Sequence, residues 1–284
     1  MITTKKINDV VVKVAKQNKK DTDTRLAKGY KLFPEPYANI FICAKKKSGK
    51  TNLLFNILDE TVGRDTHVLF FVSTIFKDKT YKAILRMLRK KGVNYHCNTS
   101  LKEETKDGTI DSLQVLVDTL TSMSQDEFED DDEDNDNEKP KDILHEIYGN
   151  GHDEEDEQEK EKKEKYLAPK YIIVFDDLST ELKSNSLVGL LKKNRHFNAK
   201  ILLCSQHYND LLPSSRLQQD YLILFKNISK EKLKEIYTDI STPISIEEFY
   251  KVYNYCTKDK FNFLYCDLIN DEFRKNFNQK IMIN

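Results

Sequence analysis

The stretch FICAKKKSGKT, residues 41–51, runs from apolar residues through a lysine-rich turn into Gly-Lys-Thr. The last three fixed positions of the Walker A pattern, G-x-x-x-x-G-K-[ST], are met by Gly49, Lys50 and Thr51. Ala44 stands where the pattern begins with glycine. Glycine is required beside the lysine because the backbone passes close to phosphate oxygens, whereas the start of the loop requires only a small residue. The stretch predicts a phosphate-binding loop, with an unliganded lysine-rich turn as the alternative.

Two side chains of this loop have distinct chemical roles. Lys50 is placed to reach the β- and γ-phosphates of a nucleoside triphosphate, and the hydroxyl of Thr51 is placed to bind Mg²⁺. The predicted nucleotide-binding residues are Ala44, Lys45, Lys46, Lys47, Ser48, Gly49, Lys50 and Thr51.

The residues on either side of the loop support the phosphate-binding interpretation. NIFIC, residues 39–43, is a short apolar run typical of a buried strand, and TNLLFNILDE, residues 51–60, has apolar residues at helical spacing. A strand, a loop and a helix in this order direct the unpaired N–H groups of the helix N-terminus at the phosphates.

The composition indicates a soluble intracellular protein. Of the 284 residues, 38% are hydrophobic, which is enough for the core of one large domain. Five cysteines are scattered without a C-x-x-C pair, which predicts a reducing compartment and no zinc site. We expect neither a membrane span nor a signal peptide, because no apolar run approaches ~18 residues and the N-terminus lacks a long apolar centre.

The formal net charge of -1 conceals a strong asymmetry. Residues 125–165 contain 20 acidic residues and 6 lysines, a net charge of -14, and the rest of the chain carries +13. So dense an acidic segment cannot bury enough apolar surface to fold, so we expect a disordered insertion. The predicted organisation is a basic N-terminal segment, residues 1–30, followed by an ATPase domain, residues 31–284, that this insertion interrupts. A basic body favours a polyanionic partner, with a merely solvated lysine-rich surface as the alternative.

Apolar runs alternate with helical patterns along the chain. Further strands are expected at 67–74, 171–175, 199–206, 221–225 and 261–268. Helices are expected at 80–92, 109–123, 228–237 and 245–256. Continuous apolar strands that alternate with helices predict an α/β fold, with a mostly parallel sheet that helices cover on both faces.

The run YIIVFDD, residues 171–177, has the form of a Walker B strand. A central strand is buried on both faces, and ligands of open α/β sheets bind at its C-terminal edge, where Asp176 can reach a Mg²⁺ ion. Asp177 beside it can orient or deprotonate an attacking water, which favours hydrolysis over transfer to a small acceptor. The alternative is that the acidic pair only caps the next helix.

A later strand also ends in polar residues. AKILLCSQ, residues 199–206, places Gln206 at the same edge of the sheet, where its amide can bind the γ-phosphate or the attacking water, and Ser205 is less suited to this role. Just before this strand, Arg195 and His196 lie together in a predicted polar turn, for which simple solvent exposure is the alternative.

Taken in order, AKKKSGKT, YIIVFDD, NRH and ILLCSQ resemble the genome-packaging ATPases of large nucleocytoplasmic DNA viruses and their virophages. These are the poxvirus-type packaging ATPases of the FtsK–HerA superfamily of P-loop NTPases. The resemblance covers roughly residues 35–268 and is most specific from Tyr171 to Gln206. The chain departs from the family pattern at Ala44, which replaces glycine, and at Asp177, which replaces a catalytic glutamate.

The resemblance implies a RecA-like core of the additional-strand type that hydrolyses ATP with Mg²⁺. It also implies a homo-oligomeric ring, double-stranded DNA and capsid or procapsid proteins as partners, and a location in the viral factory of the host cytoplasm or in the virion. The catalytic residues would be Lys50, Asp177, Gln206 and Arg195, the last acting across a subunit interface, and the metal ligands would be Thr51 and Asp176.

Two other functions are open from the sequence alone. One is a DNA-processing ATPase of the same superfamily with a segregation or helicase-like role, and the other is a nucleotide-binding scaffold without hydrolysis. ATP turnover distinguishes the scaffold from the two enzymes. A requirement for duplex rather than single-stranded DNA distinguishes the packaging motor from a helicase.

Overall fold

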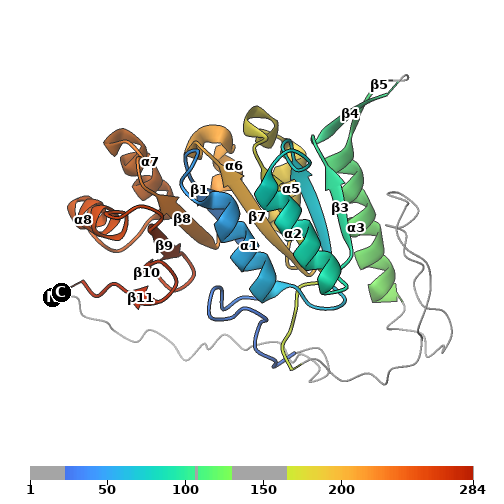
Figure 1. Ribbon diagram of the computed structural model, residues 1–284, viewed down its shortest axis with the longest axis horizontal. Helices are drawn as coiled ribbons and strands as arrows, with labels where there is room; N and C mark the ends of the chain where they lie inside the picture. Colours follow the sequence, from blue (N-terminus) through green and yellow to red (C-terminus); the bar gives the residue numbers. More distant parts are fainter. Residues whose placement is uncertain (1–22, 106–107, 130–164, 284) are drawn as a thin grey trace, which may run out of the picture.

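A nine-stranded sheet forms the centre of the computed structural model, which describes residues 23–105, 108–129 and 165–283 (Figure 1). Its parallel part is, in spatial order, β8 (Tyr221–Phe225), β1 (Asn39–Cys43), β7 (Ala199–Ser205), β6 (Tyr171–Asp176), β2 (His67–Val72) and β3 (Tyr95–Asn98). Three antiparallel strands extend it beyond β8, namely β9 (Phe263–Asp267), β10 (Glu272–Lys275) and β11 (Gln279–Lys280). The predicted α/β class with a mostly parallel sheet is confirmed.

Helices cover both faces of this sheet, as the buried apolar clusters show. One cluster includes residues of α1 (Lys50–Thr61) and α2 (Lys79–Lys90), which lie side by side in Figure 1. The cluster on the other face includes residues of α3 (Ser112–Glu129), α5 (Asn185–Lys193), α7 (Lys230–Ile240) and α8 (Ile246–Cys256). Three shorter helical segments complete the described helices. The 3₁₀ turn η2 (Ser179–Leu182) follows β6, and the 3₁₀ turn η3 (Tyr208–Asp210) follows β7. The short helix α6 (Pro213–Arg216) comes after η3.

Successive residues of β1 explain why the central strands are apolar without alternation. Ile40 and Ile42 belong to the cluster beneath α1 and α2, whereas Phe41 and Cys43 belong to the opposite cluster. All residues of β1, β6, β7 and β8 are buried. Because these strands contact helices on both faces, either side of each strand has to be apolar.

The order of the strands determines which loops meet. β7 pairs in parallel with both β1 and β6, so one strand separates the strand of the phosphate-binding loop from the acidic strand. This is the additional strand that the resemblance implies. Parallel pairing also brings the carboxyl ends of β1, β6 and β7 to one edge of the sheet, where ligands of such folds bind.

The boundaries of several elements differ from the prediction. The helix expected at 109–123 begins at Ser112, because residues 109–111 belong to a small hairpin of β4 (Lys102–Thr105) and β5 (Gly108–Asp111) that projects from the body in Figure 1. The same helix extends to Glu129, into the start of the acidic segment. The remainder of that segment up to residue 164, and residues 1–22, lie outside the described residues.

Residues before the first strand pack onto the body. Ala27 forms a parallel bridge with Leu167, and the N–H of Lys28 donates to the Leu167 carbonyl at 2.7 Å. Gly29, with φ of 76°, lies so close to Thr61 that an added Cβ would meet its methyl group at 2.6 Å. Within the described part of the chain, no helix is both long and apolar enough to cross a membrane.

Lys200 is a fully buried lysine within β7. Its Nζ donates to the Glu35 carbonyl at 3.1 Å and lies 5.5 Å from the centre of the Phe33 ring. Burial lowers the pKa of Lys200 to about 7, although the Glu35 carboxylate opposes the shift. At physiological pH this lysine is therefore poised between its neutral and its charged form.

Lys200→Met is expected to remove a pH dependence of stability. Between the folded pKa of about 7 and the unfolded value near 10, the unfolded chain binds more protons at Lys200, so the free energy of unfolding rises with pH. The contribution is ~1.4 kcal/mol per pH unit within this window. Urea unfolding at pH 7, 8 and 9 should show that the stability of Lys200→Met relative to the parent falls as pH rises. The exposed control, Lys192→Met, should give a constant difference, and parallel profiles for both variants would contradict the assignment.

Candidate functional site

The loop between β1 and α1 adopts the backbone that its sequence predicts. Gly49 has φ of 97° and ψ of 8°, a left-handed conformation that favours glycine, and it is the N-cap of α1. Glycine has no side chain that could accept hydrogen bonds from the N–H groups of the first turn, and that turn contains no acidic residue. The N–H groups of that turn therefore have no side-chain anion of their own, which suits an external phosphate.

Ala44 is compatible with its place at the start of the loop. It is buried, and its φ is not positive, so the backbone there does not require glycine. Its N–H donates to the Ser205 carbonyl at 2.9 Å, which continues the pairing of β1 with β7 by one residue. The substitution in the Walker A pattern therefore leaves the loop geometry intact.

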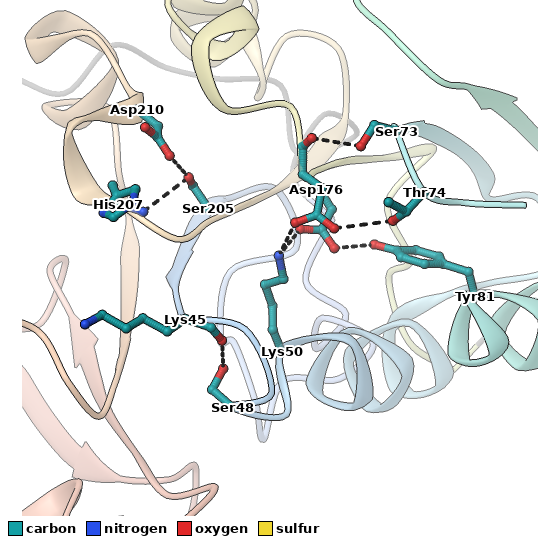
Figure 2. Close-up of polar contacts among 11 residues, drawn as sticks. Lys45, Ser48, Lys50, Ser73, Thr74, Tyr81, Asp176, Ser205, His207 and Asp210 are labelled. Carbon is teal, nitrogen blue, oxygen red and sulfur yellow. Dashed lines mark hydrogen bonds and ion pairs between the residues drawn. The ribbon is translucent and has the colours of Figure 1, made fainter. Parts of the chain in front are cut away.

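The middle of the loop presents a positive surface. Lys45, Lys46 and Lys47 are all exposed, and Lys47 has a left-handed φ of 64°. The Ser48 hydroxyl donates to the Lys45 carbonyl at 2.7 Å and so closes the turn (Figure 2). Three adjacent ammonium groups repel one another, and a bound polyphosphate would relieve that repulsion.

Lys50 joins the loop to the acidic strand. Its Nζ donates to Oδ1 of Asp176 and, at 3.0 Å, to Oδ1 of Asp177 (Figure 2). Burial favours the neutral lysine, but the two carboxylates outweigh this effect and raise the pKa of Lys50 above its ordinary value. The lysine is therefore a permanent cation that occupies the position between the loop and the acidic pair.

Asp176 ends β6 and is the most buried acid of the site, with a side chain only 1% exposed. Its Oδ2 accepts a hydrogen bond from the Tyr81 hydroxyl of α2 at 2.7 Å. Burial and the neighbouring Asp176 carboxylate raise the pKa of Tyr81, so the phenol stays protonated and remains a donor. The sequence did not indicate Tyr81, because an aromatic residue at helical spacing is typical of a core position.

Asp177 has a different environment from its neighbour. Its backbone is left-handed, with φ of 55°, which turns the chain sharply after β6. Oδ2 accepts from the Thr74 hydroxyl at 3.3 Å, and the Asp177 carbonyl accepts from Ser73 Oγ at 2.9 Å. The side chain is 33% exposed. Asp177 is therefore positioned by the end of β2 yet remains accessible to a water molecule.

Gln206 follows β7 directly and is half-buried. The Cys43 thiol lies 3.9 Å from the Gln206 carbonyl, so the glutamine backbone is beside the end of β1. Ser205 instead bonds locally, since its Oγ donates to Oδ2 of Asp210 and accepts from the His207 N–H at 3.4 Å. The structure thus places Gln206 at the edge that carries Lys50 and Asp176.

Arg195 lies near the amino-terminal ends of the parallel strands, opposite the carboxyl ends that carry the acidic pair. It precedes β7, its side chain is 65% exposed, and Nη2 lies 3.5 Å from Oδ1 of Asp220. Asp220 in turn accepts from the N–H of Asn39, the first residue of β1. The structure therefore does not bring Arg195 to the acidic pair of its own chain.

The site suits a metal that arrives with its nucleotide. Among the described residues, no three His, Cys, Asp or Glu side chains converge on a place for a metal ion. Thr51, on the first turn of α1, and Asp176 can supply two oxygen ligands, and phosphates and water would complete the shell of a hard cation. The residues present therefore fit Mg²⁺ bound to a triphosphate.

One protein-family model matches the second half of the chain. The model of the poxvirus A32 protein family matches residues 143–281. This range includes the acidic pair, Arg195 and Gln206, and the phosphate-binding loop precedes it. The resemblance to poxvirus-type proteins that the motifs predict is confirmed by this match.

Individual relatives are more distant. Uncharacterized protein 075L of Invertebrate iridescent virus 6 is 28% identical over 137 residues, which cover 45% of this chain and 52% of that protein. The chain thus matches about half the length of this relative. The DNA-packaging ATPase B204 from Sulfolobus Turreted Icosahedral Virus has a TM-score of 0.49 at 15% identity, with 85% of this chain and 97% of that chain covered. The genome packaging NTPase B204 from Sulfolobus turreted icosahedral virus 2, in complex with ATP-gammaS, has a TM-score of 0.45 at 17% identity. That match covers 85% of this chain and 98% of the B204 chain.

Proposed function

We propose that the chain is an ATP-hydrolysing motor that translocates double-stranded viral DNA into a capsid. The observation that carries this proposal is the contact of Lys50 with Asp176 and Asp177 at the mouth of a Walker A loop. It joins the two nucleotide motifs into one site at the edge of an additional-strand sheet. The match to the poxvirus A32 family supports the viral packaging role.

Each residue of the site has a proposed part in hydrolysis. Lys50 leaves the carboxylates to bind the β- and γ-phosphates of ATP. Thr51 and Asp176 would hold Mg²⁺, which would supply positive charge to offset the charge that develops on the phosphates. Asp177, which Thr74 positions, orients and deprotonates the attacking water. Gln206 binds the γ-phosphate or this water from the end of β7.

The proposed partners follow from the charge and from the resemblance. Outside the acidic segment the chain carries +13, which suits the phosphates of duplex DNA. We assign this activity to one ATPase domain, residues 31–284, into which residues 125–165 are inserted. A homo-oligomeric ring, a capsid or procapsid protein and the viral factory complete the proposal.

Millimolar Mg-ATP is expected to raise the melting temperature of the protein. A ligand at ~100 times its dissociation constant adds ~2.7 kcal/mol to the stability of the folded state, which corresponds to about 5 °C or more for a domain of this size. Scanning calorimetry with and without Mg-ATP measures the shift. An unchanged melting curve would contradict the proposed nucleotide site.

The motor itself is tested by hydrolysis. Purified protein should release phosphate from ATP, and duplex DNA should stimulate the release more than single-stranded DNA of equal length. Stimulation by single-stranded DNA alone would instead favour a helicase-like enzyme, and binding of ATP without turnover would favour a scaffold.

A further inference from the structure

An exposed aromatic residue lies beside the phosphate-binding loop. Phe261 belongs to the short connection between α8 and β9, and its side chain is 56% exposed. Its φ of 70° is left-handed, which is an outlier for a bulky residue and strains the backbone. Strain and apolar exposure at one residue favour a function over a packing role.

The ring of Phe261 contacts Gly49. A Cβ built on Gly49 would lie 3.1 Å from Cδ1 of this ring, a tight approach that the ring would have to relieve by a small shift. The sheet explains the contact, since Phe263 at the start of β9 pairs with Phe225 at the end of β8. The connection before β9 therefore lies at the edge where β1 ends, on the side of the loop away from β6.

Several hydrogen bonds hold the connection that carries Phe261. Nζ of Lys226 donates to the Lys258 carbonyl at 2.8 Å. Asn276 donates to Oδ1 of Asn262 at 3.1 Å and accepts from the N–H of Phe263 at 3.2 Å. Nζ of Lys260 lies 4.7 Å from the centre of the Phe261 ring, a cation–π contact that also keeps a positive charge beside the loop. The ring is thus presented from a segment that its neighbours fix.

We propose that Phe261 is the surface on which the base of the bound nucleotide stacks, an inference that rests on the proposed function. Lys50 and the two carboxylates define the γ-phosphate end of the site, on the β6 side of the loop. A triphosphate that lies across the loop with this end fixed directs its ribose and base away from β6, toward β8 and β9. Phe261 is the exposed aromatic that contacts the loop on that side. Stacking depends on the area of the base, so a purine nucleotide is preferred.

Calorimetric titration of the full-length protein with ATP and with inorganic tripolyphosphate tests the proposal. Base–aromatic stacking corresponds to about 5- to 150-fold in affinity, so Phe261→Ala should raise the Kd of ATP by about this factor. The Kd of tripolyphosphate should be unchanged, because this ligand has no base. Phe261→Tyr retains the ring and should bind ATP within about threefold of the parent.

A matched control is Tyr255→Ala, which removes an exposed aromatic of α8 whose ring lies under Lys275 rather than beside Gly49. It should leave both dissociation constants unchanged. Parent-like ATP affinity in Phe261→Ala would overturn the inference, and so would an equal loss of ATP and tripolyphosphate, which would show that Phe261 only supports the loop. If the parent bound neither ligand, the proposed function would fail and this inference with it.

Discussion

Asp177→Asn is expected to bind ATP at least as tightly as the parent and to hydrolyse it about 10²- to 10⁴-fold more slowly, because an oriented general base contributes this factor. The structure makes the substitution conservative, since the asparagine oxygen can still accept from Thr74 Oγ1, which lies 3.3 Å from the present carboxylate. Ground-state binding depends on the loop and Lys50, which the change leaves in place. Single-turnover hydrolysis and an equilibrium titration with ATP measure the two quantities separately.

Lys50→Ala should behave differently from Asp177→Asn. It removes the charge that pairs with the β- and γ-phosphates, so turnover should be abolished and ATP affinity should fall. It also leaves the buried Asp176 without its cation, so the melting temperature should fall even without nucleotide. The exposed Lys90 at the end of α2 provides the control outside the site, and Lys90→Ala should retain turnover and stability.

The assignment of Asp177 as the general base depends on whether Asp177→Asn loses hydrolysis but keeps ATP binding, whereas Lys50→Ala loses both. Hydrolysis at the parent rate by Asp177→Asn would show that Asp177 is not the base, and Asp176 would then be the next acid to examine. A loss of ATP binding in Asp177→Asn equal to that in Lys50→Ala would assign Asp177 to binding instead.

Arg195→Ala is expected to bind ATP and to hydrolyse it ~10³-fold more slowly, provided that the subunits are assembled. Arg195 lies at the sheet edge opposite Lys50 and is 65% exposed, so its guanidinium is available to a neighbouring subunit. A planar, permanently charged group from that neighbour can stabilise the charge that develops on the γ-phosphate. Specific activity should therefore rise with protein concentration.

Mixed assemblies provide the decisive measurement for Arg195. Lys50→Ala and Arg195→Ala subunits are each expected to be nearly inactive alone. In an equimolar mixture about a quarter of the interfaces in a head-to-tail ring would pair an intact Lys50 with an intact Arg195, so about a quarter of the parent activity should return. No recovery despite demonstrated co-assembly would argue that Arg195 acts within its own chain.

Two controls separate catalysis from local structure at Arg195. Asp220→Asn removes the negative charge 3.5 Å from Arg195 but keeps the arginine, and it should retain activity because the exposed guanidinium makes this ion pair weak. Lys192→Ala removes an exposed charge from the same turn region and should also be neutral. Equal losses in Asp220→Asn and Arg195→Ala would show that the pair supports the turn.

The sequence predicted those strands whose composition reflects burial on both faces. The strands predicted at 39–43 and 221–225 coincide with β1 and β8, and the strand predicted at 171–175 ends one residue before β6 does. β3 and β11 were not predicted, because YHCN and QK are short, polar edge segments without an apolar run. The antiparallel direction of β9 is also absent from its composition, because an apolar run carries no information on strand direction.

The same limit applies to the site. That Lys50, Asp176, Asp177 and Gln206 lie at the same end of the sheet could be predicted, because Lys50 follows a glycine and the others end or follow a strand. The positions of Tyr81 and Phe261 could not be predicted, since they depend on how α2 packs against β6 and on how β9 pairs with β8. Lys200 gave no signal either, because one lysine within an apolar strand is indistinguishable from an exposed edge residue.

The two carboxylates that pair with Lys50 compete with nucleotide for its ammonium group. An incoming triphosphate has to displace Asp176 and Asp177 from the ammonium group, so the free energy of that pair is subtracted from the affinity for nucleotide. After hydrolysis the carboxylates can pair with Lys50 again, and this competition would speed the release of the products. Weaker binding of nucleotide would then accompany faster release of products, which would suit the proposed motor, because it has to repeat its cycle many times along one DNA molecule.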